Sequence, residues 1–536
     1  MRDFHSPGRS PVLATGAMAA TSMPAATLTA LDVLRAGGNA LDAAIAAAAT
    51  LAVIEPQSTG LGGDCFCLYA PAGTGRVIAM NGSGRAPAAA TAEALLSRGV
   101  TRIEVQTPHA VTVPGAVSAW EALWRAHGRA PWDSLFQDAI RFAEHGHPVH
   151  ARVAWDWAAG AAKLAADPAA ARLFLKGGAP YAEGDIFRQP ALARTLRAIA
   201  ARGARVFYEG EIAAGIVATL RAKGGLHSEE DFAAGAAAAE FVAPIKRPYR
   251  GFDVFECPPN GSGLIALMLL GVMEGFATPD GGPLSVTRMH RHIESARLAY
   301  RDRDAFLADP AQSEVPLARL LSDDYLGALR RLIRDDAAMP ALPPAGAAEW
   351  LPRHEDTVYL CVVDQDGNAC SFINSLFDSF GSGILDEASG VLLHNRGSGF
   401  RVEPGHPNCI APMKRPLHTI IPAMLMQDGE AVMPFGVMGG HYQPMGQSWF
   451  LANHLDYGLD LQEALDLPRL FPREGEIQCE HGVPEAAMAG LAALGHRPVR
   501  WGKPHGGGQA IRIDRARGVL IGASDPRKDG CAMGLS

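Results

Sequence analysis

The pattern of hydrophobic and polar positions divides the chain into a helix-rich first part and a strand-rich last third. From residue 24 to about 222, stretches rich in Ala, Leu and Arg follow a helical period, and glycine pairs at 37–38 and 62–63 interrupt them. Short β-like runs at 66–69 and 77–80 lie among these stretches. The first part is therefore expected to form helices that pack on a sheet.

Beyond residue 357 the pattern changes to that of β-strands separated by polar turns. Three pairs of such runs follow one another along the chain, at 357–363 with 369–375, at 420–426 with 431–435, and at 510–514 with 519–523. The first two pairs predict hairpins. Together the two parts predict an antiparallel sheet to which both contribute, with helices outside it.

The first of these hairpins begins with a threonine in the setting of a cleavage site. The polar residues His354, Glu355 and Asp356 lead directly into Thr357 and an apolar run. A threonine hydroxyl is a weak nucleophile, but a threonine at a chain N-terminus has its own α-amino group as a base. Cleavage of the bond between Asp356 and Thr357 would therefore create a catalyst. Ordinary β propensity is the alternative explanation for a threonine at the head of a strand.

Eight short motifs occur in a fixed order along nearly the whole chain. They are GGNALDAA at 37–44, EPQSTGLGGD at 55–64, TVPG at 112–115, PPNGSG at 258–263, LAYRDR at 298–303, KRPL at 414–417, MGG at 438–440 and SDPR at 524–527. In this ordered set the chain resembles the γ-glutamyltransferase family of self-processing, N-terminal-nucleophile enzymes. The resemblance implies an α/β (α+β) fold class, a four-layer αββα sandwich of the N-terminal-nucleophile hydrolase type.

The same resemblance implies that the chain is a zymogen that cuts itself. The Thr357 hydroxyl would attack the Asp356 carbonyl, and water would release a large subunit, residues 1–356, from a small subunit, residues 357–536. The two would stay intertwined in one globular unit. The new α-amino group, with a reference pKa of about 7.7 to 8.0, would then serve as base while Thr357 attacks an amide and forms an acyl-enzyme.

Two stretches after the proposed cut supply candidates for the groups around Thr357. Gly439 and Gly440 lie between a strand and a helix expected from residue 444 to about 457, where backbone N–H groups and the helix dipole favour an oxyanion. A simple strand-to-helix turn is the alternative. Ser375 occupies the position at which family members carry a hydroxyl that hydrogen-bonds the nucleophile, and a surface serine is the alternative.

Other positions correspond to substrate-binding residues of the family, with replacements. Thr419 falls where relatives place paired serines that hold the substrate carboxylate, and His418 replaces the first of them. The family's Arg-Glu-x-Ala-Pro arginine, which grips the α-carboxylate of a γ-glutamyl group, is displaced two places to Arg85. The aspartate that takes the α-amino group is replaced by Gly399, and an asparagine by Phe377.

These replacements argue against a glutathione-type γ-glutamyl donor. A buried ammonium without its carboxylate partner is costly, whereas Arg85 and Arg396 have a shape suited to a carboxylate. Surface salt bridges are the alternative for both arginines. Family members with altered pockets include acylases and an oxamate amidohydrolase, so an oxamate-type amide or an acylase substrate is expected, with water as acceptor. An ordinary γ-glutamyl transpeptidase and a non-catalytic, uncleaved binding protein remain as alternatives.

Composition and charge fit an enzyme that acts on a small molecule. The chain has 536 residues, of which 48% are hydrophobic and 19% are charged, which is enough for a substantial core. A formal net charge of −8 gives no basic field for nucleic acid. The apolar run at 43–54 is too short to span a bilayer. A small amide is therefore the expected ligand, with neither nucleic acid nor membrane as partner.

The cysteines and the first residues bear on cofactors and location. Eight cysteines in a chain of this length do not form a disulfide scaffold, and the spacing of Cys65 and Cys67 does not match paired zinc ligands. No metal and no cofactor are expected. The first residues lack the basic-then-apolar order of a secretory signal, so a cytoplasmic location is expected, although many relatives are exported. The expected assembly is a heterodimer of the two cleavage fragments, which could dimerise further.

Overall fold

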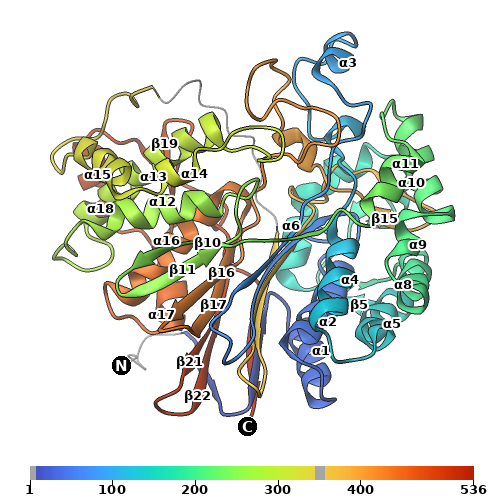
Figure 1. Cartoon of the computed structure of the whole chain (residues 1–536), viewed down its shortest axis with the longest axis horizontal. Coiled ribbons are helices and arrows are strands. Elements are labelled where there is room, and N and C mark those ends of the chain that lie inside the picture. The colour runs from blue at the N-terminus through green and yellow to red at the C-terminus, as the bar shows by residue number, and fades with distance from the viewer. Residues whose placement is uncertain (1–7, 345–356) are drawn as a thin grey trace.

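Two large antiparallel sheets form the centre of the molecule in a computed structural model that describes residues 8–344 and 357–536 (Figure 1). The first is a 7-stranded sheet in the order β1 (Val12–Ala14), β22 (Val519–Ser524), β21 (Gly507–Asp514), β17 (Glu430–Met438), β16 (Ala423–Gln427), β11 (Phe252–Glu256) and β10 (Ile245–Tyr249). The second, also 7-stranded, has the order β23 (Cys531–Leu535), β2 (Ala17–Thr21), β12 (Val358–Val363), β13 (Ala369–Ser375), β3 (Asp64–Ala70), β4 (Ile78–Gly82) and β9 (Glu240–Val242).

The two sheets face each other and share a hydrophobic layer. Phe66, Tyr359, Met424 and Ile511 belong to this layer, and all four are buried. A β-carbon added to Gly436 would lie 2.4 Å from the Tyr359 ring, so glycine on β17 is what lets the tyrosine cross between the sheets. Close contact across the layer fixes how β12 lies against β17.

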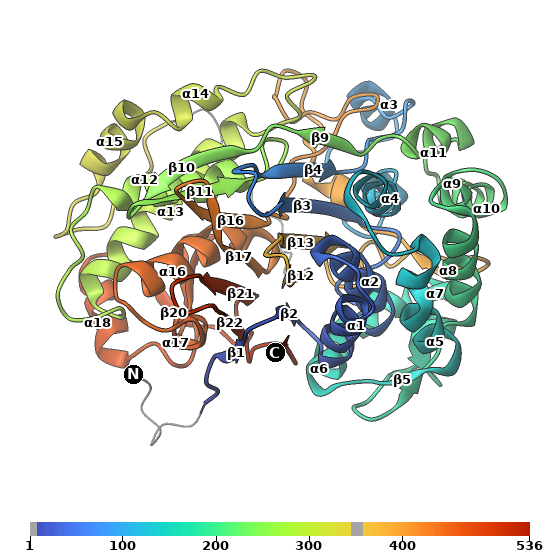
Figure 2. The same ribbon diagram turned by 60° about the horizontal axis from the view of Figure 1, so that its bottom comes forward.

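Helices cover the outer face of the second sheet (Figure 2). This group is α1 (Pro24–Arg35), α2 (Ala40–Ile54), α4 (Ala116–His127), α5 (Gln137–His145), α6 (Ala151–Ala165), α7 (Pro168–Phe174), α8 (Pro190–Arg202), α9 (Arg205–Tyr208), α10 (Glu211–Ala222) and α11 (Glu229–Gly235). Helix α3 (Ala92–Leu96) lies apart from them and packs in a separate small cluster with Phe400 and Ile410. Every residue of α2 is buried, because its small alanines let the helix lie between the sheet and the outer helices. Its N-terminus is closed by a capping box between Asn39 and Asp42.

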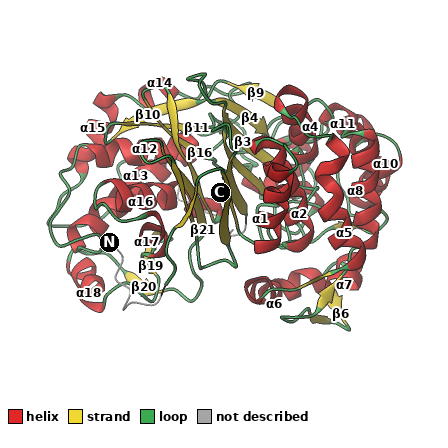
Figure 3. Ribbon diagram, turned by 90° about the horizontal axis from the view of Figure 1, so that it is seen from below, coloured by secondary structure: helices red, strands yellow, loops and turns green. Residues whose placement is uncertain are grey.

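A second group of helices covers the outer face of the first sheet (Figure 3). It comprises α12 (Gly263–Glu274), α13 (Val286–Phe306), α14 (Leu317–Leu320), α15 (Asp323–Leu332), α16 (Gln443–Leu455), α17 (Leu461–Asp466) and α18 (Glu485–Ala493). Helix α12 is apolar almost all round and packs against both α13 and α16. The sheets are thus covered on both outer faces, as their near-continuous burial requires.

Short strands and 3₁₀ turns make up the remaining elements. They are β5 (His147–Pro148), β6 (Leu175–Lys176), β7 (Ala179–Pro180), β8 (Ile186–Phe187), β14 (Leu385–Asp386), β15 (Val391–Leu392), β18 (Leu470–Arg473), β19 (Glu476–Cys479), β20 (Pro498–Arg500), and the 3₁₀ turns η1 (Pro108–Ala110), η2 (Trp132–Phe136), η3 (Arg396–Gly399) and η4 (Gly440–Tyr442). No helix within the described ranges is both long enough and apolar enough to cross a bilayer.

The two predicted hairpins and the two later strands are confirmed. Strands β12 and β13 pair with Val358 opposite Asn374, β16 pairs with β17, and β21 pairs with β22. The structure has two large sheets, and each combines strands from before and after residue 357. The division into subunits 1–356 and 357–536 stays a prediction, and Asp356 lies outside the described residues.

Candidate active site

Thr357 stands at the head of β12, next to Ser375 at the end of β13. The register that pairs Val358 with Asn374 places these two residues opposite each other. Both are fully buried, and their hydroxyl oxygens are 3.0 Å apart. Ser375 is therefore a core residue, and its Oγ also accepts the backbone N–H of Phe377 at 2.8 Å. A predicted nucleophile and its predicted hydroxyl partner are thus in hydrogen-bond contact.

Gly439 and Gly440 lie at the same end of the sheet layer as Thr357. The ring of His441, which directly follows Gly440, lies 5.9 Å between centroids from the ring of Phe377, and the Phe377 N–H donates to the same Ser375 hydroxyl that contacts Thr357. Gly439 has φ +120°, and an added β-carbon would lie 2.8 Å from the Cα of Gly506. Only glycine fits here. The expected helix is present as α16, which begins three residues after Gly440. A role for their N–H groups in binding an oxyanion stays a prediction.

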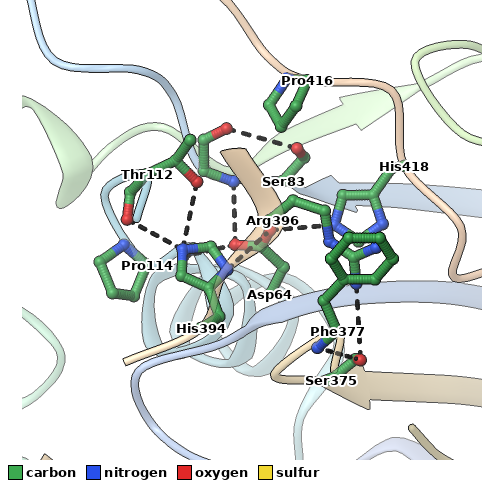
Figure 4. Close-up of polar contacts among 12 residues, drawn as sticks. Asp64, Ser83, Thr112, Pro114, Ser375, Phe377, His394, Arg396, Pro416 and His418 are labelled. Carbon is green, nitrogen blue, oxygen red and sulfur yellow. Dashed lines mark hydrogen bonds and ion pairs between the residues drawn. The ribbon is translucent and has the colours of Figure 1, made fainter. Parts of the chain in front are cut away.

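Arg396 points its guanidinium into the space beside these hydroxyls. Its Nη1 donates to Thr419 Oγ1 at 2.7 Å. Its Nη2 lies 3.5 Å from Ser375 Oγ (Figure 4). The side chain is fully buried, and within the described part of the chain its Nε has no hydrogen-bond partner. Burial lowers the pKa of Arg396 to about 9 against the opposing charge of Asp64, so the group stays protonated at neutral pH.

The aromatic ring of Phe377 packs against the guanidinium of Arg396. The Arg396 Cζ lies 3.9 Å from the centre of the Phe377 ring, which is a cation–π contact. Phe377 adopts φ +78°, a left-handed conformation that a bulky side chain rarely takes. Such strain costs on the order of 1–3 kcal/mol and tends to persist where the surroundings impose it. The backbone is therefore distorted next to the candidate nucleophile, at the residue that supports the arginine.

Asp64 is a buried carboxylate beneath this group, and the sequence did not single it out as a site residue. Its Oδ1 accepts the backbone N–H groups of Gly84 and Gly115 at 3.0 and 3.1 Å. Its Oδ2 faces the rings of His418 at 2.9 Å and His394 at 3.5 Å (Figure 4). Burial raises the pKa of the Asp64 carboxyl, but His394, His418 and the charge of Arg396 more than offset it, so the pKa lies below its usual range.

The two histidines connect Asp64 to the rest of the site. Burial lowers the pKa of His418 to about 3, so the neutral ring donates from Nε2 to Asp64. Burial also lowers the pKa of His394, whose Nε2 lies 2.9 Å from the Thr112 carbonyl oxygen. Asp64 and Thr112 both lie in motifs of the ordered set. The signal that could have identified Asp64 is its position just ahead of the strand expected at 66–69, directly after the glycine pair 62–63.

His418 was expected to hold a substrate carboxylate, and the structure places its ring on Asp64. The PPNGSG motif holds its backbone, because the His418 N–H donates to the Asn260 carbonyl and its own carbonyl accepts the Ser262 N–H, each at 2.9 Å. The hydroxyl of its neighbour Thr419 accepts a hydrogen bond from Arg396. The substrate roles of His418 and Thr419 are not tested by these contacts and stay predictions.

Arg85 lies apart from this group of side chains. Its guanidinium donates to Glu240 at 2.8 Å and to the Met413 carbonyl at 3.0 Å, and it lies 3.7 Å from Asp309. These partners are the protein's own acceptors. Of the two arginines selected from the sequence, only Arg396 therefore contacts Ser375 and Thr419 directly, and a substrate role for Arg85 stays a prediction.

A metal ion has no evident place in the described structure. Residues 8–344 and 357–536 hold no group of three or more His, Cys, Asp and Glu side chains arranged to bind one. The groups that the structure gathers around Thr357 are hydroxyls, a guanidinium and the buried carboxylate of Asp64 with its two histidines.

Thr357 directly precedes a strand of one of two facing antiparallel sheets and is hydrogen-bonded to a serine, an arrangement that fits the class of N-terminal-nucleophile hydrolases. A family model for gamma-glutamyltranspeptidase matches residues 26–535. The chain belongs to the gamma-glutamyltranspeptidase family, and it is an amidohydrolase proenzyme of that family.

Individual relatives are similar over nearly their whole length. The glutathione hydrolase-like YwrD proenzyme of Bacillus subtilis (strain 168) is 36% identical over 94% of this chain and 95% of its own. The oxamate amidohydrolase proenzyme of Klebsiella pneumoniae is 35% identical over 97% and 99%. The crystal structure of cephalosporin acylase from Bacillus halodurans has a TM-score of 0.92 and 37% identity, with 100% of this chain and 99% of that chain covered.

Proposed function

We propose that this protein is a self-processing N-terminal-threonine amidohydrolase whose substrate carries a carboxylate directly on the amide carbonyl, as oxamate does. One observation carries the proposal: the buried guanidinium of Arg396 lies 3.5 Å from Ser375, which is hydrogen-bonded to Thr357. The similarity to an oxamate amidohydrolase supports it. We also infer that the two sheets and their outer helices form the four-layer αββα sandwich of N-terminal-nucleophile hydrolases.

The short path from arginine to nucleophile limits the size of the acyl group. A carboxylate bonded to a guanidinium lies about 2.7–2.9 Å from its nitrogens, and a carbonyl poised for attack lies about 3–3.5 Å from the nucleophile. Arg396 is separated from Thr357 by only two contacts, of 3.5 and 3.0 Å, through Ser375. A substrate whose carboxylate and scissile carbonyl are bonded to each other fits this spacing better than a longer chain.

In the proposed reaction the α-amino group of Thr357 takes the hydroxyl proton as Oγ1 attacks the carbonyl. The C–N bond breaks, the proton passes to the departing nitrogen, and an oxalyl ester forms on Thr357. Water then attacks the ester and releases oxalate. Arg396 neutralises the substrate carboxylate, and the N–H groups of Gly439 and Gly440 would face the oxyanion. The names of the relatives as proenzymes support the self-cleavage that frees the amine.

A γ-glutamyl donor suits this site less well. Its α-ammonium needs a carboxylate partner, and the position that supplies it in the family is Gly399 here. The cationic Arg396 stands nearby, stacked on Phe377, so an ammonium in this space would meet a like charge in a dry environment. Ordinary γ-glutamyl transpeptidase activity is therefore the second candidate, which the glutathione hydrolase-like relative favours.

The test is to compare two amides with the same purified, mature protein. Ammonia release from oxamate and arylamine release from a γ-glutamyl anilide give kcat/KM values on one enzyme preparation. We expect oxamate to be the better substrate by more than tenfold. Turnover of the anilide at a higher kcat/KM than oxamate would overturn the proposal. A chain that stays whole on a denaturing gel and hydrolyses neither amide would point to a non-catalytic binding protein.

A further inference from the structure

His394 is a buried histidine whose ring lies against the carboxylate of Asp64, and the proposed reaction gives it no part. It follows β15 in the chain, and its backbone N–H donates to the Gly62 carbonyl at 3.0 Å. Its ring Nδ1 lies 3.5 Å from Oδ2 of Asp64, and its Nε2 lies 2.9 Å from the carbonyl oxygen of Thr112 (Figure 4). The ring is therefore held between a carbonyl and a carboxylate.

The contact with Thr112 fixes where the ring hydrogen of His394 sits. A carbonyl oxygen can only accept, so the neutral ring carries its hydrogen on Nε2, and Nδ1 is left as an acceptor. Within the described part of the chain this Nδ1 has no hydrogen-bond partner. It faces the carboxylate of Asp64, which is ionised and can only accept. A second ring hydrogen, on Nδ1, would turn this contact of two acceptors into an ion pair.

The neighbouring His418 is not prepared for a proton in the same way. Its Nε2 donates to Asp64 at 2.9 Å, and its Nδ1 accepts the Ile420 N–H at 3.3 Å. A proton on Nδ1 would break the bond to Ile420. Burial lowers the pKa of His418 to about 3. Of the two histidines on Asp64, His394 is thus the one whose geometry favours a second proton.

Burial and the charge of Arg396 together keep His394 neutral when no ligand is bound. Burial lowers the pKa of His394 and Arg396 lowers it further, whereas Asp64 and the bond to Thr112 raise it. A carboxylate on the Arg396 guanidinium would offset that positive charge, so the pKa of His394 would rise. Because linkage is reciprocal, a protonated His394 must also strengthen the binding of the carboxylate.

The charges of this buried group leave the carboxylate of a substrate without a counter-charge. Asp64 and Arg396 carry opposite charges and both histidines are neutral, so the four fully buried side chains have no net charge. An added carboxylate brings one negative charge into buried surroundings, which is costly unless it is balanced. The α-amino group of Thr357 cannot balance it, because that group must stay neutral to act as the base.

We propose that His394 takes up one proton from solvent when a carboxylate binds to Arg396, and that the resulting ion pair with Asp64 stabilises the bound anion. The inference rests on the proposed function, in which Arg396 holds the carboxylate of an oxamate-type substrate. The proton binds to Nδ1 and is released when the acid product departs, so the net reaction is unchanged. His394 acts through Asp64 and Arg396 without touching the substrate, which makes it a positioning residue.

The experiment measures proton uptake when oxalate, the product of the proposed reaction, binds to the mature enzyme at pH 6. Titration calorimetry in two buffers of different ionisation enthalpy gives the number of protons. At this pH oxalate is ionised and the Thr357 amine, with a reference pKa of about 7.7 to 8.0, is already protonated. We expect an uptake of about 0.3 to 1 proton per site, since one group can take up no more than one.

The same linkage predicts how oxalate affinity depends on pH. As pH falls from about 7 to about 5.5, the affinity should rise by about twofold or more per pH unit, because protonated His394 strengthens binding. In His394→Gln the side-chain amide can still donate to the Thr112 carbonyl but cannot titrate. Uptake should therefore be near zero in this variant, and the affinity should not change with pH over this range.

His227→Gln is the matched control. His227 is also buried, its Nε2 lies 2.9 Å from the Val111 carbonyl oxygen, and its Nδ1 has no hydrogen-bond partner within the described ranges. It lies near enough to His394 for their charges to interact, and Asp231 acts on it without forming an ion pair among the described residues. Since no carboxylate faces its Nδ1 as Asp64 faces that of His394, this variant should keep the wild-type uptake.

The outcomes separate this inference from the proposed function. If oxalate binds, binds more weakly to Arg396→Gln, and brings no proton with it, the inference is wrong and the proposed role of Arg396 stands. Uptake that persists in His394→Gln, or that disappears equally in His227→Gln, would overturn the inference as well. If cleaved wild-type protein does not bind oxalate, the proposed function fails and the inference fails with it. The wild-type uptake alone decides the matter if His394→Gln does not fold.

Discussion

Arg396 illustrates how one buried charge can define a substrate. Its guanidinium has Thr419 as its hydrogen-bonding neighbour at 2.7 Å, Ser375 at 3.5 Å, and the face of Phe377 beneath it. The buried Asp64 supplies the opposite charge nearby without a direct hydrogen bond in the described structure. A cation held in this way retains donors for a ligand, and a planar carboxylate is the ligand whose geometry matches a guanidinium.

Replacing Arg396 tests this role. We expect Arg396→Gln to lower kcat/KM for oxamate by about 10- to 100-fold, mainly through KM, because a charge-assisted hydrogen bond is lost. Arg396→Lys keeps the charge without the planar fork and should lose less. Arg85→Gln is the companion variant, and since Arg85 is bound to Glu240 we expect less than about a threefold change there. An unchanged KM in Arg396→Gln would contradict the account.

Glu55 gives a pH dependence of stability that can be tested separately. Burial raises the pKa of this carboxyl to about 7, although Lys528 and a hydrogen bond from Ser22 oppose the rise. Between pH 4.5 and 7 the folded protein therefore holds a proton that the unfolded chain has lost, so the free energy of unfolding decreases as pH rises through this window. Above the folded pKa the full penalty remains.

We therefore expect Glu55→Gln to gain stability relative to the wild type between pH 4.5 and 8, by at most about 3 kcal/mol. Melting temperatures of both proteins across this range measure the difference. The amide preserves the hydrogen bond with Ser22, so the comparison isolates the charge. A difference that is constant with pH would show that Glu55 ionises normally in the folded protein.

At the level of single residues, the sequence predicted the contact between two residues that lie opposite each other on paired strands. Thr357 and Ser375 were both identified, and a hairpin of the predicted length places them opposite each other. Asp64 and His394 were missed because their contact joins segments 330 residues apart in the chain, and no local pattern reports it. The sequence offered Arg85 and Arg396 as equally suitable carboxylate ligands. Only their different contacts in the folded protein distinguish them.

At the level of elements, the turn between β17 and α16 combines a left-handed backbone conformation at Gly439 with close contact between two backbone segments. Gly439 sits at φ +120° with its Cα facing Gly506, and η4 then leads into the N-terminus of α16.

Strands and helices here were predictable, because alternation and apolar spacing mark them. The bounds moved by a few residues, as for the strand expected at 431–435, which runs from Glu430 to Met438.

Gly439→Ala tests the turn. An added β-carbon would lie 2.8 Å from the Gly506 Cα, so the backbone must move and the N–H groups with it. We expect kcat to fall by about 100-fold or more, as for the loss of an oxyanion donor. Gly458→Ala is the matched control: Gly458 also has a positive φ, +67°, but nothing lies within 4 Å of an added β-carbon. It should cost stability through strain and leave kcat nearly unchanged. Equal losses in both variants would refute an oxyanion role.

At the level of the whole molecule, the strands before and after residue 357 are interleaved. Strand β2 lies between β23 and β12, β13 pairs with β3, and β11 pairs with β16. Two antiparallel sheets with helices on both sides were partly predictable, because the family resemblance supplied the layers that alternation alone does not. The order of strands could not be read from the sequence, since neighbours such as β1 and β22 lie at opposite ends of the chain.

This interleaving predicts that cleavage leaves the fragments together. On gel filtration without denaturant we expect one peak that contains both pieces and elutes with the uncut Thr357→Ala variant, because separating the pieces would break hydrogen-bonded ladders in both sheets. A denaturing gel of the same peak should show two bands. Fragments that elute separately would contradict the predicted intertwined unit.

The most direct test of the account is the N-terminal sequence and intact mass of the active enzyme. We predict two pieces, the smaller beginning Thr357-Val358-Tyr359, and amide hydrolysis that rises in parallel with their formation. Full activity in protein whose 356–357 peptide bond is intact, or whose small fragment begins at any other residue, would contradict the claim that cleavage makes Thr357 the nucleophile.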